Sequence, residues 1–379
     1  MKEINKKLLI VVNVDWFFIS HRLCIAEQAI KDGWEVYVVA EGTGRSNEII
    51  VKGINFINCP FSRSGTNLID ELKTMHSFYK IYKKVKPDVV HHVTLKPVIY
   101  GSVISKVIGV KGTLNAISGL GYNFTGDRKG LVQKMMIGLM KYGFNQKNLA
   151  IIFQNQDDYN EIKQLNILSP QNRVHFIKGS GVDLKKFYHT PLRKNSKIKV
   201  LLPTRMLWDK GVAELRQVTQ ILKDKYHNKV LFVLSGLADN ENKAGVPKEY
   251  LQDWEEENYV KWIGYQKNMV EVYQDADIVV LPSYREGMPK SLIEACAIGR
   301  PIITTNAIGC RECVDEGRNG FKVAVKSINE LALVLEKLIL SEEKRIAMGN
   351  YSREKAEKEF SQEMVIDKHI NIYSCLNEG

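Results

Sequence analysis

The sequence contains no hydrophobic run of the length that a membrane-spanning helix needs, which is about 20 residues. Leu8 to Val12 is apolar but short, and charged or polar residues follow it soon afterwards. We therefore expect no transmembrane helix, and we predict that Leu8 to Val12 lies in a first buried strand.

Cysteine is scarce, with 6 residues in a chain of 379. Cys310 and Cys313 are the one close pair, and no histidine cluster accompanies them, so a zinc site is not expected. Metal ligands are accordingly predicted to be absent. Scattered, reduced thiols are typical of a cytoplasmic protein.

The glycine-rich turn of dinucleotide-binding folds is also missing. The first predicted strand is followed by Asp15-Trp16-Phe17-Phe18, and no Gly-x-Gly-x-x-Gly pattern stands there. The sequence therefore lacks the main feature that would indicate a nicotinamide-dependent oxidoreductase.

Basic residues outnumber acidic residues in this chain, most of all in its first half. The formal net charge is +11, and residues 51–150 hold 15 basic against 4 acidic side chains. This excess predicts a positive face on the first half, directed at phosphate, lipid headgroups or nucleic acid. The sequence shows no zinc finger, helix-turn-helix pattern or basic strand interleaved with aromatic residues, which weakens the nucleic-acid alternative.

Short β-branched apolar runs alternate with longer amphipathic stretches, which predicts an α/β fold with parallel sheets. The pattern runs once and then restarts, so we expect two doubly wound Rossmann-like domains that face a central cleft. The predicted domains are residues 1–183 and 197–351, joined by a linker over 184–196 and followed by a helix over 352–379 that either packs on the second domain or crosses back to the first. The predicted strands are Leu8–Val14, Glu35–Ala40, Asn55–Cys59, Asp88–His92, Gly112–Ile117, Ala150–Gln154 and Val174–Ile177, then Lys197–Pro203, Val230–Ser235, Val260–Ile263, Ile278–Leu281, Pro301–Thr304 and Gly320–Val323.

The segment from Leu281 to Glu294 carries the most chemical information. It directly follows a predicted strand, and Pro289 suits the first position of a helix whose free N–H groups can bind a diphosphate. Gly287 lets a ligand approach the backbone. Glu286 and Glu294 then bracket this helix start, and they could hydrogen-bond both ends of a nucleotide sugar. Alternatively, Glu294 is a solvated helix residue and Glu286 a loop charge.

With this segment, the sequence resembles the retaining glycosyltransferases of family 4, which have the GT-B fold. The resemblance covers nearly the whole chain. It rests on Leu281–Glu294 and on four further segments: Gly299–Ile303, Thr204–Gly211, Gly179–Asp183 and Gly309–Glu312.

The resemblance implies a site for a nucleotide-sugar donor, expected to be a UDP-sugar, in the second domain. Its implied catalytic residues are Glu286, Arg205 and Lys210. Arg205 and Lys210 would neutralise the donor diphosphate, so that no metal ion or other cofactor is required. The implied donor-binding residues are Arg205, Lys210, Glu286, Gly287, Met288, Pro289, Glu294 and Glu312.

An acceptor site is expected in the first domain. Asp15–Arg22, Asp88–Pro97 and Ile117–Tyr122 are similar to segments of family members from bacterial surface-polysaccharide pathways. Many members carry a histidine where this chain has Ser118, so the acceptor-side base is open. The candidate acceptor-side residues are His21, Arg22, His92, Lys96 and Ser118, and a structural role is the alternative for both histidines.

A basic, methionine-rich segment spans Arg128 to Phe144 and is typical of a helix in a bilayer interface. Its methionines could instead pack in the core, with its lysines on a solvated rim. The candidate membrane-surface residues are Arg128, Lys129, Lys134 and Lys141.

Together, these features predict a metal-independent, retaining glycosyltransferase that is cytoplasmic and peripheral on the inner, anionic face of the cell membrane. The family members it resembles most add N-acetylgalactosamine to undecaprenyl-diphosphate-linked saccharides, so a UDP-N-acetylhexosamine donor and a polyprenyl-diphosphate-linked acceptor are expected. Two alternatives stay open. One is a GT-B transferase with a soluble, lipid A or other glycolipid acceptor and a different donor, and the other is a non-catalytic, basic membrane- or nucleic-acid-binding protein.

Overall fold

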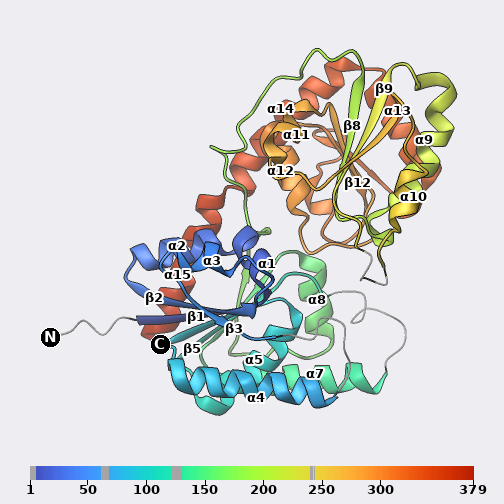
Figure 1. The fold of residues 1–379 in the computed structure, drawn as a ribbon. Helices are drawn as coiled ribbons and strands as arrows, with labels where there is room; N and C mark the ends of the chain where they lie inside the picture. The colour runs from blue at the N-terminus through green and yellow to red at the C-terminus, as the bar shows by residue number, and fades with distance from the viewer. Residues whose placement is uncertain (1–5, 61–67, 121–129, 240–241, 243) are drawn as a thin grey trace. The chain divides into compact units, whose positions relative to one another are not determined.

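The computed structural model describes residues 6–60, 68–120, 130–239, 242 and 244–379. It divides into two compact units (Figure 1). Unit 1 comprises residues 1–180 together with 363–379, and unit 2 comprises residues 181–362. Arg128 and Lys129 lie outside the described residues.

Unit 1 contains a seven-stranded, all-parallel sheet in the order β3-β2-β1-β4-β5-β6-β7. The strands are β1 (Lys6–Val14), β2 (Trp34–Glu41), β3 (Asn55–Asn58), β4 (Val89–Val93), β5 (Gly112–Ile117), β6 (Leu149–Phe153) and β7 (Arg173–Phe176). The helices are α1 (Asp15–His21), α2 (Leu23–Lys31), α3 (Ser46–Ile50), α4 (Leu68–Val85), α5 (Leu95–Ile108), α7 (Leu131–Phe144), α8 (Gln156–Gln164) and α15 (Gln362–Glu378).

Unit 2 contains a six-stranded parallel sheet in the order β10-β9-β8-β11-β12-β13. The strands are β8 (Ile198–Pro203), β9 (Val230–Ser235), β10 (Val260–Gly264), β11 (Ile278–Leu281), β12 (Ile302–Thr305) and β13 (Gly320–Val323). The helices are α9 (Val212–Tyr226), α10 (Lys248–Gln252), α11 (Met269–Asp275), α12 (Lys290–Ile298), α13 (Ile328–Ile339) and α14 (Glu342–Glu359), with two short 3-10 turns, η1 (Trp208–Lys210) and η2 (Arg311–Cys313).

The thirteen predicted strands all occur, with ends that differ by at most two residues. Their sequences are apolar without strict alternation because both faces of each sheet are buried. In β1, for example, Leu8 and Ile10 belong to a core beneath α2 and α15, whereas Leu9 and Val11 belong to a core beneath α4 and α5. The helix layers on the two faces are visible in Figure 1. The predicted fold class, two doubly wound parallel-sheet domains, is confirmed.

The last predicted helix is divided in two in the structure, and its second part belongs to the first domain, as one of the two alternatives predicted. Residues 352–379 form the end of α14 and a separate helix, α15, with a break at Phe360 and Ser361. Val365, Ile372 and Leu376 of α15 are buried in the core of unit 1. The last helix is therefore part of the first domain's core.

The segment 184–196, expected to be a linker, lies in unit 2. Phe187 is 7% exposed within the core of unit 2, and the Thr190 carbonyl accepts a hydrogen bond from Arg300 at 2.7 Å. These contacts attach the segment to the second sheet. The polar composition of the segment did not predict these contacts.

Within the described residues, no helix combines the length and the apolar character required to cross a bilayer.

His92 in β4 makes the stability of unit 1 dependent on pH. Its ring is fully buried, and burial lowers its pKa to about 4. The unfolded chain binds a proton near the ordinary pKa of about 6.5, whereas the folded chain does not. We therefore expect the free energy of unfolding to fall by about 3 kcal/mol as the pH falls from about 6.5 to about 4.

Denaturant unfolding at a series of pH values measures this dependence. The His92→Asn variant should show a shallower loss of stability with falling pH, whatever its stability at pH 7. His76→Asn, a change at an exposed histidine of α4, should keep the wild-type slope. Equal slopes in His92→Asn and wild type would contradict the assignment.

Candidate active site

The residues predicted to bind a donor come together at one place in unit 2. The strand order reverses between β8 and β11, and in such sheets ligands bind at the carboxyl ends of the strands beside this switch point. The loop after β8 carries Lys210, and the loop after β11 carries Glu286. The two loops lie side by side because their strands are neighbours.

Lys210 and Glu286 form the central contact of this site. The Lys210 Nζ lies 2.6 Å from the Glu286 Oε1. The side chains are 10% and 19% exposed, so the pair is largely shielded while remaining open to a ligand. Asp209 Oδ2 lies further from the same ammonium, at 3.9 Å. The site therefore holds a cation and a carboxylate at hydrogen-bonding distance before any ligand binds.

Two glycines allow the loops to pack this closely. Gly211 has a φ of 75°, and a Cβ on it would lie 2.3 Å from the Pro282 carbonyl oxygen. Gly309, in the loop after β12, has a φ of 78°, and a Cβ there would lie 2.2 Å from the Glu286 carbonyl oxygen. Any larger residue at either position would displace the backbone that presents Lys210 or Glu286.

Glu214 and Tyr284 form a second connection between the β8 and β11 loops, which sequence reasoning missed. The Tyr284 hydroxyl donates to Glu214 Oε1 at 2.5 Å. The Tyr284 backbone N–H donates to the Asp209 carbonyl at 2.8 Å. Glu214 stands in the first turn of α9, three residues after Gly211. The available signal was a carboxylate three residues after Gly211, beside a loop that we expected to bind phosphate.

Helix α12 begins immediately after the Glu286 loop. Pro289 is its N-cap and Lys290 its first residue, one position later than predicted. The first N–H groups of a helix have no partner within it, so this end can receive a phosphate group.

Glu294 lies inside α12 and is partly exposed. Burial raises the pKa of its carboxyl group, while Lys290 and the Tyr273 hydroxyl oppose the shift. This environment differs from that of a solvated helix residue.

The other predicted donor residues lie around the same loops. Arg205 follows β8 and is exposed, and it forms no ion pair with any residue in the described part of the chain. Gly287 is part of the contact with Gly309, and Met288 is 8% exposed in the core of unit 2. Glu312 is partly exposed in η2, beyond the Gly309 turn.

One Asp-x-Asp pair, Asp275-Ala276-Asp277, precedes β11 and deserves comparison with metal-dependent sugar transferases. Asp275 Oδ2 accepts a hydrogen bond from Lys199 Nζ at 2.6 Å, and Asp277 Oδ2 accepts one from the Lys199 backbone N–H at 2.8 Å. Both lie at the amino end of β11, whereas Glu286 follows its carboxyl end. Among the described residues, no group of three or more His, Cys, Asp or Glu side chains has the arrangement of a metal site.

In unit 1, Asp15 takes the place of a phosphate-binding turn at the end of β1. Its buried carboxylate accepts hydrogen bonds from the backbone N–H groups of Trp16, Thr43 and Arg45, at 2.7 to 2.9 Å. Burial alone would raise the pKa of Asp15, but the hydrogen bond from the Thr43 hydroxyl and the three backbone bonds together lower it. The carboxylate thus connects the end of β1 to the loop that follows β2.

The acceptor-side candidates separate into two groups. Lys96 follows β4 and Ser118 follows β5, and these strands are neighbours, so both residues lie at the carboxyl edge of the sheet. Lys96 Nζ lies 2.6 Å from Glu71 Oε1. Thr94, next to them, has a φ of 74°, which is rare for a β-branched residue and is seen mostly at functional sites.

The remaining candidates have structural surroundings. Both ring nitrogens of His92 are engaged, by Tyr82 Oη at 2.8 Å and Asn115 Oδ1 at 2.7 Å. These contacts favour the structural alternative for His92. Arg22 is 2% exposed and also inaccessible to an acceptor. His21 is partly exposed and stacks on Phe17, with ring centroids 4.1 Å apart.

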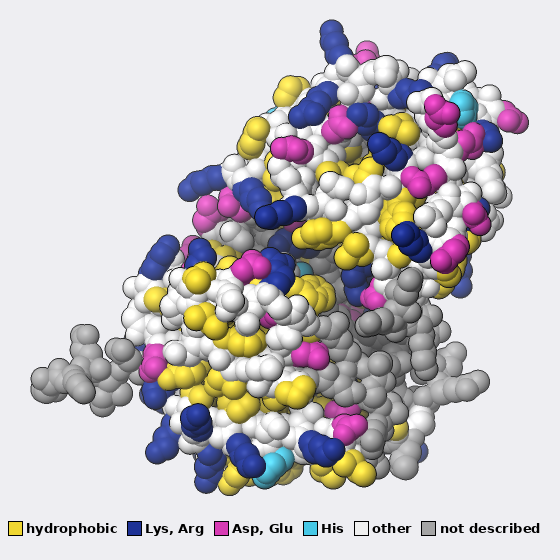
Figure 2. Space-filling view, in the orientation of Figure 1, with side chains coloured by type: hydrophobic (Ala, Val, Ile, Leu, Met, Phe, Trp, Pro, Cys, Tyr) yellow, Lys and Arg dark blue, Asp and Glu magenta, His cyan; other side chains and the backbone are white. Residues whose placement is uncertain are grey.

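The predicted membrane segment coincides with α7. Met140 and Phe144 are buried in the core beneath it, whereas Lys134, Met135, Lys141 and Tyr142 are exposed. Helix α4, which packs with α7 against α5, adds exposed residues, among them Ile69, Leu72, Lys73, Lys80, Lys83 and Lys84. Figure 2 shows basic and hydrophobic side chains together along this edge of unit 1. Met140 therefore packs in the core, whereas Met135 lies on the exposed face of the same helix.

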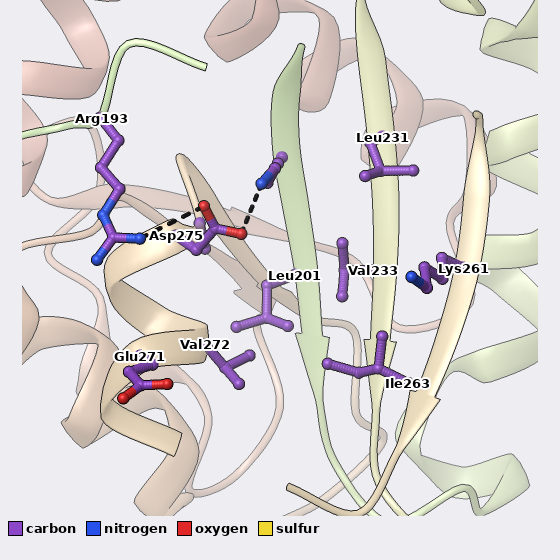
Figure 3. A pocket seen from close by; sticks show the side chains of 11 residues that line it. Arg193, Leu201, Leu231, Val233, Lys261, Ile263, Glu271, Val272 and Asp275 are labelled. Carbon is purple, nitrogen blue, oxygen red and sulfur yellow. Dashed lines mark hydrogen bonds and ion pairs between the residues drawn. The ribbon is translucent and has the colours of Figure 1, made fainter. Parts of the chain in front are cut away.

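A cavity of about 410 Å³ lies elsewhere in unit 2, between β8, β9, β10 and α11 (Figure 3). Its walls are mainly apolar, including Leu201, Val233 and Ile263. On its rim, Asp275 pairs with Lys199 and lies 3.8 Å from Arg193. None of the predicted site residues lines it.

Comparison with known families agrees with this geometry. Residues 7–155 match the family model described as glycosyl transferase 4-like. Residues 185–355 match the model described as glycosyl transferases group 1. The chain belongs to the GT-B glycosyltransferases, with a 4-like first domain and a group 1 second domain, and it is therefore a transferase enzyme.

Two curated relatives cover most of the chain. An N,N'-diacetylbacillosaminyl-diphospho-undecaprenol alpha-1,3-N-acetylgalactosaminyltransferase of Campylobacter jejuni is 27% identical, over 91% of this chain and 93% of its own length. A UDP-Gal:alpha-D-GlcNAc-diphosphoundecaprenol alpha-1,3-galactosyltransferase of Escherichia coli is 24% identical, over 90% of this chain and 89% of its own.

Solved structures show the same fold. Sucrose-phosphate synthase from Thermosynechococcus elongatus is 17% identical with a TM-score of 0.79, covering 98% of this chain and 99% of that one. HepE from Anabaena in complex with UDP is 16% identical with a TM-score of 0.78, covering 98% and 100%. The predicted GT-B fold is confirmed.

Proposed function

We propose that this enzyme transfers a sugar, with retention of configuration, from a UDP-sugar to a polyprenyl-diphosphate-linked saccharide. An N-acetylhexosamine is the proposed sugar, because the Campylobacter relative is an N-acetylgalactosaminyltransferase. Both relatives named above act on undecaprenyl-diphosphate-linked saccharides, which favours this acceptor class over a soluble one.

The observation that carries the proposal is the Lys210–Glu286 pair, with its 2.6 Å contact at the switch point beside the start of α12. Breaking a sugar–diphosphate bond develops negative charge on the leaving phosphate. A fixed ammonium and a helix start directed at that charge stabilise the transition state more than the ground state. Glu286 orients the ammonium and remains close enough to hydrogen-bond the sugar.

Lys210 and Arg205 are proposed to do the work that a divalent cation does in other sugar transferases. Arg205 is exposed at the rim of the loop, where its guanidinium can reach a phosphate oxygen. We expect the transfer rate to be unchanged, within about twofold, when divalent metals are removed with EDTA. A rate that falls with EDTA and returns with Mn²⁺ or Mg²⁺ would overturn the cationic mechanism.

The acceptor is proposed to bind unit 1 at the carboxyl ends of β4 and β5. Lys96 offers a cation and Ser118 a hydroxyl, both suited to phosphate or sugar oxygens. The topological switch point of this sheet lies between β1 and β4, where ligands of such sheets bind.

The surface formed by α4 and α7 is proposed to bind an anionic membrane, which would bring the enzyme to a lipid-linked acceptor. Each basic residue near such a surface contributes about 1 kcal/mol. Replacing both Lys134 and Lys141 with glutamate should therefore lower partitioning onto phosphatidylglycerol vesicles by about tenfold or more. Vesicle sedimentation measures the bound fraction.

The matched control places the same charge change on unit 2. Lys229 and Lys248 are exposed, and their double replacement by glutamate should alter vesicle binding far less. Activity on a short-chain, water-soluble acceptor should persist in both variants. If the two double variants bind vesicles equally, the surface is assigned wrongly.

A panel of UDP- and GDP-sugars with undecaprenyl-diphosphate-linked saccharides tests the function as a whole, with products identified by mass spectrometry. We expect one UDP-N-acetylhexosamine to give a product larger by one sugar. Transfer from GDP-sugars alone, or only to soluble acceptors, would contradict the proposal.

A further inference from the structure

A cluster of buried polar side chains lies in unit 1, between β4 and the returning helix α15. Arg22, His91, His369 and Tyr373 are each at most 2% exposed. His91 Nδ1 lies 2.7 Å from the Tyr373 hydroxyl, and the His91 and His369 ring centroids are 5.5 Å apart. The proposed transfer chemistry uses none of these groups.

Three nitrogens of this cluster have no hydrogen-bond partner among the described residues: Arg22 Nε, His91 Nε2 and His369 Nε2. Buried polar atoms are nearly always bonded, to protein or to a bound species. The three side chains are electrostatic neighbours. Burial is the largest cause of the lowered pKa of His91 and His369, and the charge of Arg22 lowers the pKa of both further. Neighbouring unsatisfied nitrogens indicate a small bound species.

The charge of Arg22 indicates the chemistry of that species. Buried charges are normally paired, because an isolated buried ion is strongly disfavoured. Arg22 Nη1 donates to the His21 carbonyl at 2.8 Å, but in the described part of the chain no carboxylate pairs with the guanidinium. Its titratable neighbours are Tyr373 and Cys24, which are neutral, and the two histidines. The missing partner is a negative charge.

We propose that Arg22, His91 and His369 form a buried site for one small monovalent anion, such as chloride, which binds together with a proton. Three unsatisfied nitrogens suit a monatomic ion better than a phosphate, which has four oxygens to satisfy.

The proton follows from the tautomer of His369. Its Nδ1–H donates to the Val365 carbonyl at 2.7 Å, so its Nε2 can donate to an anion only when the ring is protonated. Without an anion, burial and Arg22 oppose that protonation, as do His91 and His175 when they are charged. A bound anion would favour protonation of His369, so the anion and the proton stabilise each other.

The site would join three separate parts of unit 1. Arg22 lies between α1 and α2, His91 in β4, and His369 in α15. Anion binding should therefore stabilise the attachment of α15 to the first domain, and weakly acid conditions should strengthen the effect.

Two measurements on the full-length protein test this site. In crystals grown in sodium bromide at about pH 5.5, where histidine begins to protonate, diffraction at the bromine absorption edge should show an anomalous peak beside Arg22 Nε. In thermal unfolding, sodium bromide should raise the Tm relative to sodium gluconate at equal ionic strength, and by more at about pH 5.5 than at about pH 7.5.

Variants separate this site from general salt effects. Arg22→Met should abolish the bromide-dependent rise in Tm, whereas Arg45→Met, at an exposed arginine of the same unit, should retain it. His369→Gln should retain a bromide effect but lose its dependence on pH. A wild-type crystal without a bromine peak at the cluster would overturn the proposal even if Arg22→Met fails to fold, and so would equal bromide effects in the two arginine variants.

Discussion

Glu286→Gln is expected to lower kcat for sugar transfer by about 100-fold or more. The amide keeps the shape of the side chain but removes the negative charge that lies 2.6 Å from Lys210 Nζ. The ammonium then loses the partner that directs it, and the sugar loses a charged acceptor of hydrogen bonds. Steady-state kinetics measure the loss. They use the donor and the lipid-linked acceptor that the panel of UDP- and GDP-sugars identifies.

Glu257→Gln is the matched control, since Glu257 is an exposed glutamate of unit 2 and should leave kcat unchanged. Combining Glu286→Gln with Lys210→Met should cost less than the sum of the two single effects, because the residues act as a pair. Near-normal kcat in folded Glu286→Gln would remove Glu286 from the mechanism.

Arg300→Met is expected to reduce the free energy of unfolding of unit 2 by about 3 kcal/mol or more. Arg300 is fully buried. Its guanidinium donates to the carbonyls of Thr190, Tyr273 and Gln274, at 2.7 to 3.1 Å. Methionine fills similar space but leaves these carbonyls without their donor.

Urea unfolding followed by circular dichroism measures this change. Arg318, which is exposed and stacks over Tyr351 at 4.1 Å, provides a matched control, and Arg318→Met should cost less than about 1 kcal/mol. Comparable losses in both variants would show that the buried network contributes little.

The sequence predicted the strands and their grouping because each strand is a run of β-branched residues buried on both faces. The predicted bounds of the linker and of the last helix differ from the structure because they depend on long-range contacts. Nothing in residues 184–196 indicates that Thr190 meets Arg300, and nothing in the composition of the last helix shows that Ile372 completes the core of the first domain. Both contacts join residues more than a hundred positions apart.

For the candidate site, the sequence identified the loops and residue types, but not their pairing. Spacing and resemblance singled out Lys210 and Glu286, yet their direct contact arises only from the neighbouring positions of β8 and β11. For His92 the sequence left a chemical and a structural role open. Tyr82 and Asn115 contact both of its ring nitrogens, which favours the structural role.

The return of α15 to unit 1 has a consequence for synthesis on the ribosome. Residues 363–379 leave the exit tunnel after the whole of unit 2, which is continuous in sequence and can fold as it emerges. Until then, unit 1 cannot complete its core, and the apolar surface that packs against Val365, Ile372 and Leu376 stays exposed. During translation, the first domain is therefore the one in need of chaperone protection, and it matures last.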